Sequence, residues 1–191
     1  MSKLIEVSGT PDAGKTTTIN MVKNELIKRF LPVKVIGEAG GKTLPPKSSR
    51  KNLNYNIWIG TNVAESILSA KEYCEKDSII IVDRGFIDYQ FWVYYYLKKG
   101  KCSLDEANEA LKMNIFKNKS LIPDLFIGVT TSVEEATKRS RNNINTVSLE
   151  FHNKVFLDFF ETIPTPKHLL DTTNLSPEES TKKFLELLEV H

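Results

Sequence analysis

The sequence predicts an α/β fold in which helices cover both faces of a parallel sheet. Three observations support this fold class. Short apolar runs alternate with longer amphipathic segments along the chain, which is the pattern of strand–helix–strand units. A glycine-containing turn joins the first apolar run to the first amphipathic segment. Ser-x-x-Glu pairs that begin at Ser103, Ser132 and Ser176 have the spacing of capping boxes and predict three helix starts.

Five short apolar runs are the candidate strands, and amphipathic segments follow several of them. The runs cover residues 3–7, 33–37, 78–83, 125–129 and 168–171. Helical spacing of apolar residues occurs in three segments, with Ile19, Val22 and Leu26 in the first, Val63, Ile67 and Ala70 in the second, and Ala107, Leu111 and Ile115 in the third. We expect each of these faces to pack in the core. Since no repeat or flexible linker divides the chain, residues 1–191 are expected to form a single domain.

Composition narrows the classes of function. The net charge is +2, from 26 basic and 24 acidic residues, so no global field favours nucleic acid or an anionic membrane as a partner. No apolar stretch reaches membrane-spanning length and no signal peptide is recognisable, which favours a cytoplasmic protein. Cys74 and Cys102 lack metal-ligand spacing, which is typical of free thiols in a reducing compartment.

The turn after the first apolar run has the complete sequence of a phosphate-binding P-loop. Residues 9–16 read GTPDAGKT and match G-x-x-x-x-G-K-[ST] between a predicted strand and a predicted helix. Backbone N–H groups, the positive end of the helix and the Lys15 ammonium would bind the negative charges of a nucleoside triphosphate. Gly9 and Gly14 permit backbone angles that a side chain would forbid. The residues predicted to bind the nucleotide are Gly9, Asp12, Ala13, Gly14, Lys15, Thr16 and Thr17.

Two side chains are candidate ligands of Mg²⁺. The hydroxyl of Thr16 follows the P-loop lysine, and Asp83 ends the apolar run of residues 78–83. A strand-end carboxylate is the second element with which P-loop proteins hold a metal or its water. An ordinary aspartate that caps the next turn is the alternative reading of Asp83.

Two residues at predicted strand ends are candidates for binding a second molecule, the acceptor of a phosphoryl group from the triphosphate. Arg84 directly follows Asp83 and could bind phosphate or sugar oxygens, or form a surface ion pair. Glu38 begins a polar stretch over 38–55 that reads as a long loop, and it is the only acid there. A carboxylate at this place could orient or deprotonate a hydroxyl acceptor, or remain a solvated loop acid. The aromatic run over 91–96 could stack on a base, although such runs more often form helix core.

A basic cluster lies further along the chain. Lys138, Arg139 and Arg141 precede the turn-like residues 142–145. We predict that residues of about 138–147 form a lid whose cations close over the triphosphate, with a solvated helix face as the alternative.

These motifs together resemble the nucleoside and nucleotide kinases, a family typified by thymidylate kinase and the deoxynucleoside kinases. The P-loop has the family's position, and Glu38-Ala39-Gly40-Gly41 is similar to the family's Glu-Pro-Gly-Gly. Asp83-Arg84 resembles its Asp-Arg motif, and the basic cluster resembles its lid. The resemblance spans most of the chain.

The resemblance implies a three-layer P-loop NTPase fold with a five-stranded parallel sheet, ATP with Mg²⁺, and transfer of the γ-phosphoryl group to a nucleoside or nucleoside monophosphate. The residues implied in catalysis are Lys15, Glu38, Asp83, Arg84, Arg139 and Arg141, with Thr16 and Asp83 as metal ligands. The expected partner is a small-molecule acceptor, and a homodimer is left open. Two alternatives remain, a P-loop kinase for another small hydroxyl or a nucleic-acid 5′ end, and a regulatory nucleotide-binding ATPase module.

Overall fold

The structure is a computed structural model that describes residues 2–38, 53–112, 118–140 and 145–189. It contains all five predicted strands, each within two residues of the expected bounds. They are β1 (Lys3–Gly9), β2 (Val33–Ile36), β3 (Ile79–Asp83), β4 (Leu125–Thr130) and β5 (Lys167–Asp171). The strands are all parallel, in the order β2-β3-β1-β4-β5. The carboxyl ends of β1 and its two neighbours therefore lie together at one edge of the sheet.

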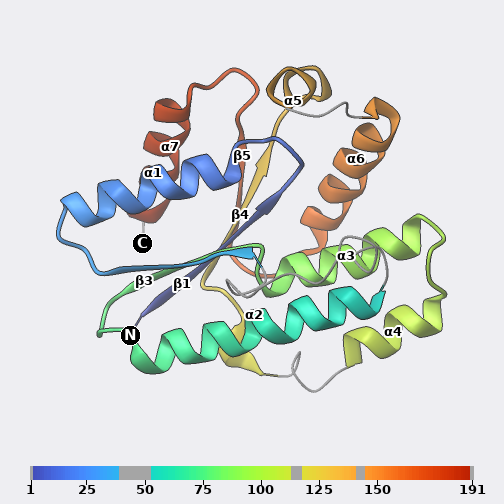
Figure 1. Cartoon of the computed structure of the whole chain (residues 1–191), viewed down its shortest axis with the longest axis horizontal. Helices are drawn as coiled ribbons and strands as arrows, with labels where there is room; N and C mark the ends of the chain where they lie inside the picture. Colours follow the sequence, from blue (N-terminus) through green and yellow to red (C-terminus); the bar gives the residue numbers. More distant parts are fainter. Residues whose placement is uncertain (1, 39–52, 113–117, 141–144, 190–191) are drawn as a thin grey trace.

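Helices cover both faces of this sheet (Figure 1). The elements are α1 (Lys15–Lys28), α2 (Leu53–Tyr73), α3 (Phe86–Lys98), α4 (Leu104–Lys112), the 3₁₀ turn η4 (Lys119–Leu121), α5 (Val133–Arg139), α6 (Thr146–Thr162) and α7 (Pro177–Glu189). Helices α1 and α7 pack together on one face, whereas α2, α3 and α6 pack on the other. Helix α4 lies outside α3. The predicted three-layer α/β architecture is confirmed.

The core follows from the alternation of side chains along buried strands. Ile5 and Ile81 pack against α1 and α7, whereas their neighbours Leu4 and Ile80 pack against α2 on the opposite face. The predicted apolar face of α1 is buried, as is that of α2.

One predicted apolar face is confirmed at Ala107 and wrong at Leu111. Leu111 is 40% exposed, whereas Ala107 and Ala110 of α4 are buried against Tyr89 and Val93 of α3. The small alanines allow α4 to approach α3 closely, and this contact turns Leu111 toward solvent. Ile115 lies outside the described residues. Most of the predicted loop over 38–55 does too, and α2 begins at Leu53, before the expected end of that loop.

Two of the three capping boxes form in full. In the boxes at Ser103 and Ser176, the glutamate three residues on accepts the serine N–H, and the serine hydroxyl accepts the N–H of that glutamate. Ser132 accepts the N–H of Glu135, but its own N–H donates to Thr173 Oγ1 at 2.9 Å. The Glu135 carboxylate instead binds Arg139, with 3.0 Å between Oε1 and Nε.

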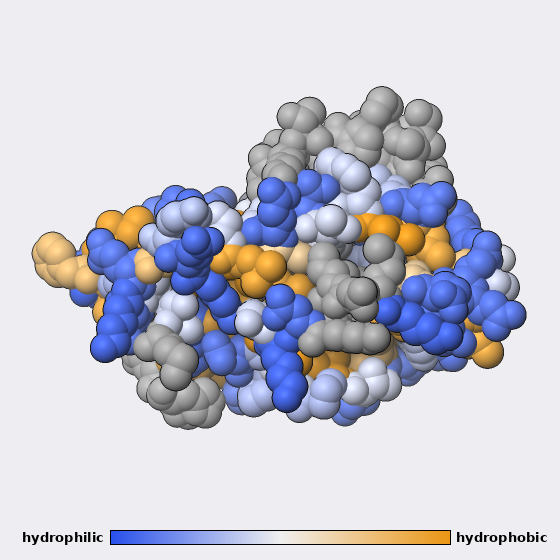
Figure 2. Space-filling model, turned by 90° about the horizontal axis from the view of Figure 1, so that it is seen from below, coloured by the Kyte–Doolittle hydropathy of each residue, from blue (hydrophilic) through white to orange (hydrophobic). Residues whose placement is uncertain are grey.

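The surface agrees with the balanced composition. On the face drawn in Figure 2, hydrophilic side chains separate the hydrophobic patches. Among the residues that the structure describes, no helix has the length and apolar character needed to cross a membrane. Cys74 and Cys102 are both free thiols, as the sequence predicted.

Candidate active site

A cavity of about 780 Å³ opens at the carboxyl edge of the sheet. It lies over the N-terminus of α1, where unpaired backbone N–H groups and the helix dipole favour an anion. Its walls combine the P-loop with side chains that follow β2, β3 and β5. The predicted site residues that line it are Asp12, Ala13, Gly14, Lys15, Thr16, Thr17, Glu38, Asp83, Arg84 and Arg139.

The P-loop depends on its two glycines for different reasons. Gly9 has φ of 148°, and a Cβ there would lie 1.8 Å from the carbonyl oxygen of Val129 on the neighbouring strand. Gly14 has φ of 83° and caps α1, with no heavy atom within 4 Å of a Cβ at this position. Gly9 therefore permits close packing of the loop on β4, and Gly14 permits the left-handed turn into the helix.

The ammonium of Lys15 lies inside the loop. Its Nζ donates to the carbonyl oxygen of Thr10 at 2.6 Å and to that of Gly9 at 3.2 Å. Burial, together with the nearby positive charge of Arg84, lowers the pKa of Lys15 to about 7. A polyphosphate in the cavity would supply the negative charge that raises this pKa and retains the ammonium form.

Thr16 and Asp83 lie together on facing elements. The Thr16 hydroxyl at the start of α1 donates to Asp83 Oδ2 at the end of β3, over 3.1 Å. Two hard oxygen donors at the edge of a phosphate-binding cavity fit Mg²⁺, because this ion takes one or two protein ligands and completes its shell with phosphate oxygens and water. Within the described residues there is no cluster of three or more His, Cys, Asp or Glu that could hold a metal by itself.

A second cavity of about 470 Å³ adjoins the first. Glu38 and Arg84 line both cavities and mark the junction between them. Glu38 lies two residues beyond the end of β2, because the strand ends at Ile36 and not at residue 37 as expected. Four aromatic rings, two lysines, an isoleucine and an aspartate complete the lining of the second cavity. These residues are Tyr55, Ile59, Asp88, Trp92, Tyr95, Tyr96, Lys99 and Lys101.

Arg84 is held at this junction by its backbone and its side chain. Its φ of 60° is unusual for a residue with a side chain, and its N–H donates to the Val7 carbonyl oxygen at 2.9 Å. The guanidinium lies 3.6 Å from Asp88 Oδ1 and 3.8 Å from Glu38 Oε1. Burial alone would lower the pKa of Arg84, but these carboxylates raise it above its ordinary value. Arg84 is therefore a fixed cation.

The sequence analysis missed two buried acids near Arg84. One of them pairs with Arg84, and the other binds the backbone at the start of α3. Asp88 accepts hydrogen bonds from the Ser8 hydroxyl and from Trp92 Nε1. Glu6 accepts the N–H of Ile87 at 2.9 Å and that of Asp88 at 2.7 Å, which caps α3. Burial raises the pKa of Glu6 to about 8 although these two N–H donors oppose the shift. The signals were an acid inside an apolar strand and an acid four residues after an arginine.

The rings of residues 91–96 divide between the core and the wall of the second cavity. Phe91 is fully buried among the rings of α3 and α6, as the core reading expected. Trp92 is only partly buried and lines the second cavity, with its ring centroid 5.9 Å from the Arg84 guanidinium carbon. His152 packs edge-on against both rings, and burial lowers its pKa to about 3.

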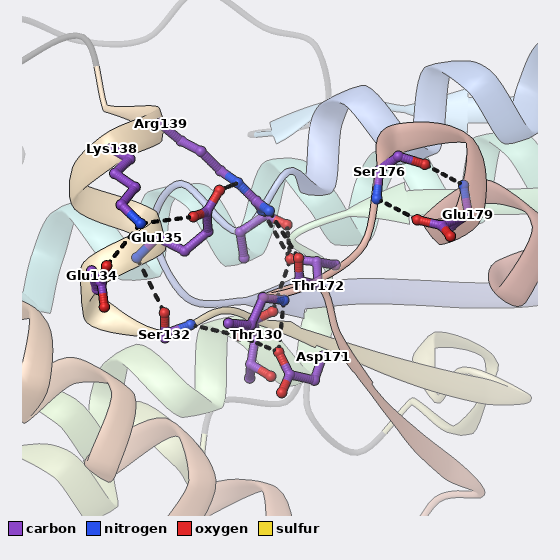
Figure 3. A network of polar contacts seen from close by, with 12 residues as sticks. Thr130, Ser132, Glu134, Glu135, Lys138, Arg139, Asp171, Thr172, Ser176 and Glu179 are labelled. Carbon is purple, nitrogen blue, oxygen red and sulfur yellow. Dashed lines mark hydrogen bonds and ion pairs between the residues drawn. The ribbon is translucent and has the colours of Figure 1, made fainter.

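The predicted lid is described in part, and Figure 3 shows its base. Arg139 lines the first cavity at the end of α5, where its guanidinium donates to Thr172 Oγ1 at 3.1 Å and to the Thr172 carbonyl oxygen at 2.8 Å. The Thr172 hydroxyl in turn lies 3.0 Å from the Ala13 carbonyl oxygen of the P-loop. Lys138 pairs with Glu134 on the surface of α5, which agrees with the solvated-face reading. Arg141 lies outside the described residues.

Sequence comparison identifies a matching family and named relatives. Residues 4–122 match the AAA domain family. The chain is 28% identical over 169 residues to thymidylate kinase of Thermoanaerobacter sp. (strain X514), with 80% of this chain and 79% of that protein covered.

Solved structures share the fold over almost the whole chain. A deoxyadenosine kinase from M. mycoides with bound dATP superposes with a TM-score of 0.75 at 19% identity, covering 96% of this chain and 98% of that chain. Thymidylate kinase from Candida albicans superposes with a TM-score of 0.68 at 22% identity, covering 98% of this chain and 91% of that chain. The similarity to thymidylate kinases over about four fifths of the chain supports an enzyme. Because the family match spans more than half of the sequence, the chain belongs to the AAA domain family.

Proposed function

We propose that this enzyme transfers the γ-phosphoryl group of ATP, with Mg²⁺, to a nucleoside or a nucleoside monophosphate, and that residues 1–191 act as one domain. The observation that carries the proposal is the pair of adjoining cavities with Glu38 and Arg84 at their junction. One cavity has the P-loop chemistry of a phosphate donor site, and the other has aromatic walls suited to a base.

The residues divide between donor, metal and acceptor. Lys15 and the backbone N–H groups at the start of α1 bind the polyphosphate, and Thr16 and Asp83 hold Mg²⁺. Bound Mg²⁺ neutralises charge on the phosphate oxygens. Arg139, from the wall of the donor cavity, adds a cation to the donor side. Arg141 lies outside the described residues, and its role in the lid stays a prediction from the sequence.

The transfer step requires little covalent chemistry from the protein. An acceptor oxygen bonds to the γ-phosphorus while the bond from phosphorus to the β,γ-bridging oxygen breaks, and ADP leaves with that electron pair. Glu38 takes the proton when the acceptor is a hydroxyl. Positioning and neutralisation of charge, by Arg84 among others, supply most of the rate.

A Lys15→Ala variant tests the donor site. ATP consumption with Mg²⁺ is measured against a panel of ribonucleosides, deoxynucleosides and their monophosphates, and product masses are read directly. Lys15→Ala should abolish transfer and leave the unfolding transition in place, whereas Lys28→Ala, on the exposed surface of the same helix, should behave as wild type. Normal transfer by Lys15→Ala would refute the site. Hydrolysis without any phosphorylated product would refute the acceptor assignment.

A further inference from the structure

The charge balance at the junction of the two cavities distinguishes between acceptor classes. Arg84 is the described cation that lines both cavities, and two carboxylates accompany it. Asp88 Oδ1 lies 3.6 Å from its guanidinium and Glu38 Oε1 lies 3.8 Å from it. The guanidinium therefore has its charge compensated before any acceptor arrives.

The fold holds the Asp88 carboxylate in place beside the charge of Arg84. Asp88 is 4% exposed, and its two carboxylate oxygens accept the Ser8 hydroxyl and the Trp92 indole N–H. Its backbone N–H is bound by Glu6. Breaking these contacts would leave buried polar groups without partners, so Asp88 does not move away to free Arg84 for a second anion.

The other described charges at the junction do not change this balance. Lys15 and Asp83 serve the donor phosphates and the metal, which leaves Arg84, Asp88 and Glu38 for the acceptor, with a combined charge of one negative unit. A phosphate monoester carries roughly −1.5 to −2 charge at neutral pH and would be repelled there. A hydroxyl is neutral and can donate to a carboxylate.

The remaining cations that line the second cavity, Lys99 and Lys101, follow the last residue of α3. Lys99 follows the last residue of α3 and donates to the Tyr95 hydroxyl at 3.1 Å. The helical rise places it roughly 16 Å along the axis from Asp88. The Lys99 ammonium is bound at Tyr95, away from the Arg84–Asp88 pair, and Lys101 lies two residues further along the chain.

On the basis of the proposed function, we infer that the acceptor is a nucleoside whose hydroxyl is phosphorylated, and that Asp88 sets this preference over the nucleoside monophosphate. The nucleoside oxygen bonds to the γ-phosphorus, its proton passes to the Glu38 carboxylate, and the bond to the β,γ-bridging oxygen breaks. The products are ADP, the nucleoside monophosphate and a proton that Glu38 releases to solvent.

The first test compares kcat/KM for each nucleoside with that for its own 5′-monophosphate, with ATP and Mg²⁺. At least one nucleoside should exceed its monophosphate by about tenfold or more, the scale of one uncompensated charge at this separation. Higher kcat/KM for the monophosphates would overturn the inference and leave the proposed function standing. No phosphorylated product from any acceptor would overturn both.

The second test removes the charge of Asp88 while keeping its shape. In Asp88→Asn the amide oxygen can accept the Trp92 N–H, and the amide nitrogen can donate to Ser8, so the local contacts persist. The ratio of kcat/KM for monophosphate to that for nucleoside should rise at least about fivefold, through a lower KM for the monophosphate. Asp158→Asn on the exposed surface of α6 should leave the ratio unchanged. An unchanged ratio in Asp88→Asn, with the fold retained, refutes the role of Asp88.

Discussion

Gly85 connects Arg84 to α3 and offers a quantitative test of how the junction is supported. A Cβ at Gly85 would lie 2.7 Å from both Cδ and Oε2 of Glu6. This is closer than carbon and oxygen atoms pack, so Gly85→Ala must displace the Glu6 carboxylate. That carboxylate accepts the N–H groups of Ile87 and Asp88 at 2.9 and 2.7 Å. The substitution therefore breaks the cap of α3.

The magnitude follows from those two hydrogen bonds. The Glu6 carboxyl is mostly neutral at pH 7 because its pKa is about 8, and a buried donor left without its partner costs about 1 to 3 kcal/mol. Displacement of Glu6 weakens one bond fully or both in part, so we expect Gly85→Ala to lower the free energy of unfolding by about 1 to 3 kcal/mol. Gly37→Ala is the matched control, because a Cβ there has no heavy atom within 4 Å. This substitution should change the free energy of unfolding by less than about 0.5 kcal/mol.

The assay is urea unfolding at equilibrium, followed by tryptophan fluorescence. The steric argument would be refuted if the free energies of unfolding of Gly85→Ala and of the Gly37→Ala control differed by no more than about 0.5 kcal/mol. A double-mutant cycle identifies the partner. Glu6→Ala removes the clashing atoms, so adding Gly85→Ala to that variant should cost less than it does in the wild type. Equal cost in both backgrounds would mean that another contact is responsible.

Three further predictions concern other parts of the site. Asp83→Asn should raise the Mg²⁺ concentration for half-maximal rate by about tenfold or more, and leave ADP binding without metal little changed, as rate titrations and calorimetry would show. Thr172→Val removes the hydroxyl that contacts Ala13 and Arg139, and should lower unfolding free energy by about 1 to 3 kcal/mol in urea. His152 has a folded-state pKa of about 3, below its ordinary value of 6.5, so its contribution to stability is lost as pH falls below about 6.5. Between about pH 7.5 and 4.5, the free energy of unfolding of His152→Phe should therefore fall by about 3 kcal/mol less than that of the wild type. Equal losses in the two proteins would contradict the lowered pKa of His152.

The strands and the P-loop were predictable because their determinants are local. Continuous apolar runs specify buried parallel strands, and the P-loop is contiguous in sequence, so Lys15 and Thr16 needed no tertiary information. The apolar face of α4 failed as a prediction because the close approach of Ala107 and Ala110 to α3 depends on packing that periodicity does not encode.

The support of the acceptor side could not be read from the sequence. Asp88 acquires its role from Ser8, which lies 80 positions earlier and becomes its neighbour only because β1 lies beside β3 in the sheet. The sequence shows a run of aromatic residues over 91–96 that includes Trp92. Which of these rings faces a cavity depends on the rotation of α3 against α6. Such contacts are products of the topology.

The Thr172 hydroxyl links the P-loop to α5 across the first cavity. It contacts the Ala13 carbonyl of the P-loop and accepts from Arg139 of α5, so a displacement at either place disturbs the other. Free-energy coupling between two sites is reciprocal. If a nucleotide reorders the P-loop and thereby changes the opening equilibrium of α5 by some factor, the nucleotide affinities of the open and closed forms of α5 differ by that same factor. The amide exchange rates of α5 would measure this factor. Helix α5 thereby becomes a reporter of an event that takes place at α1.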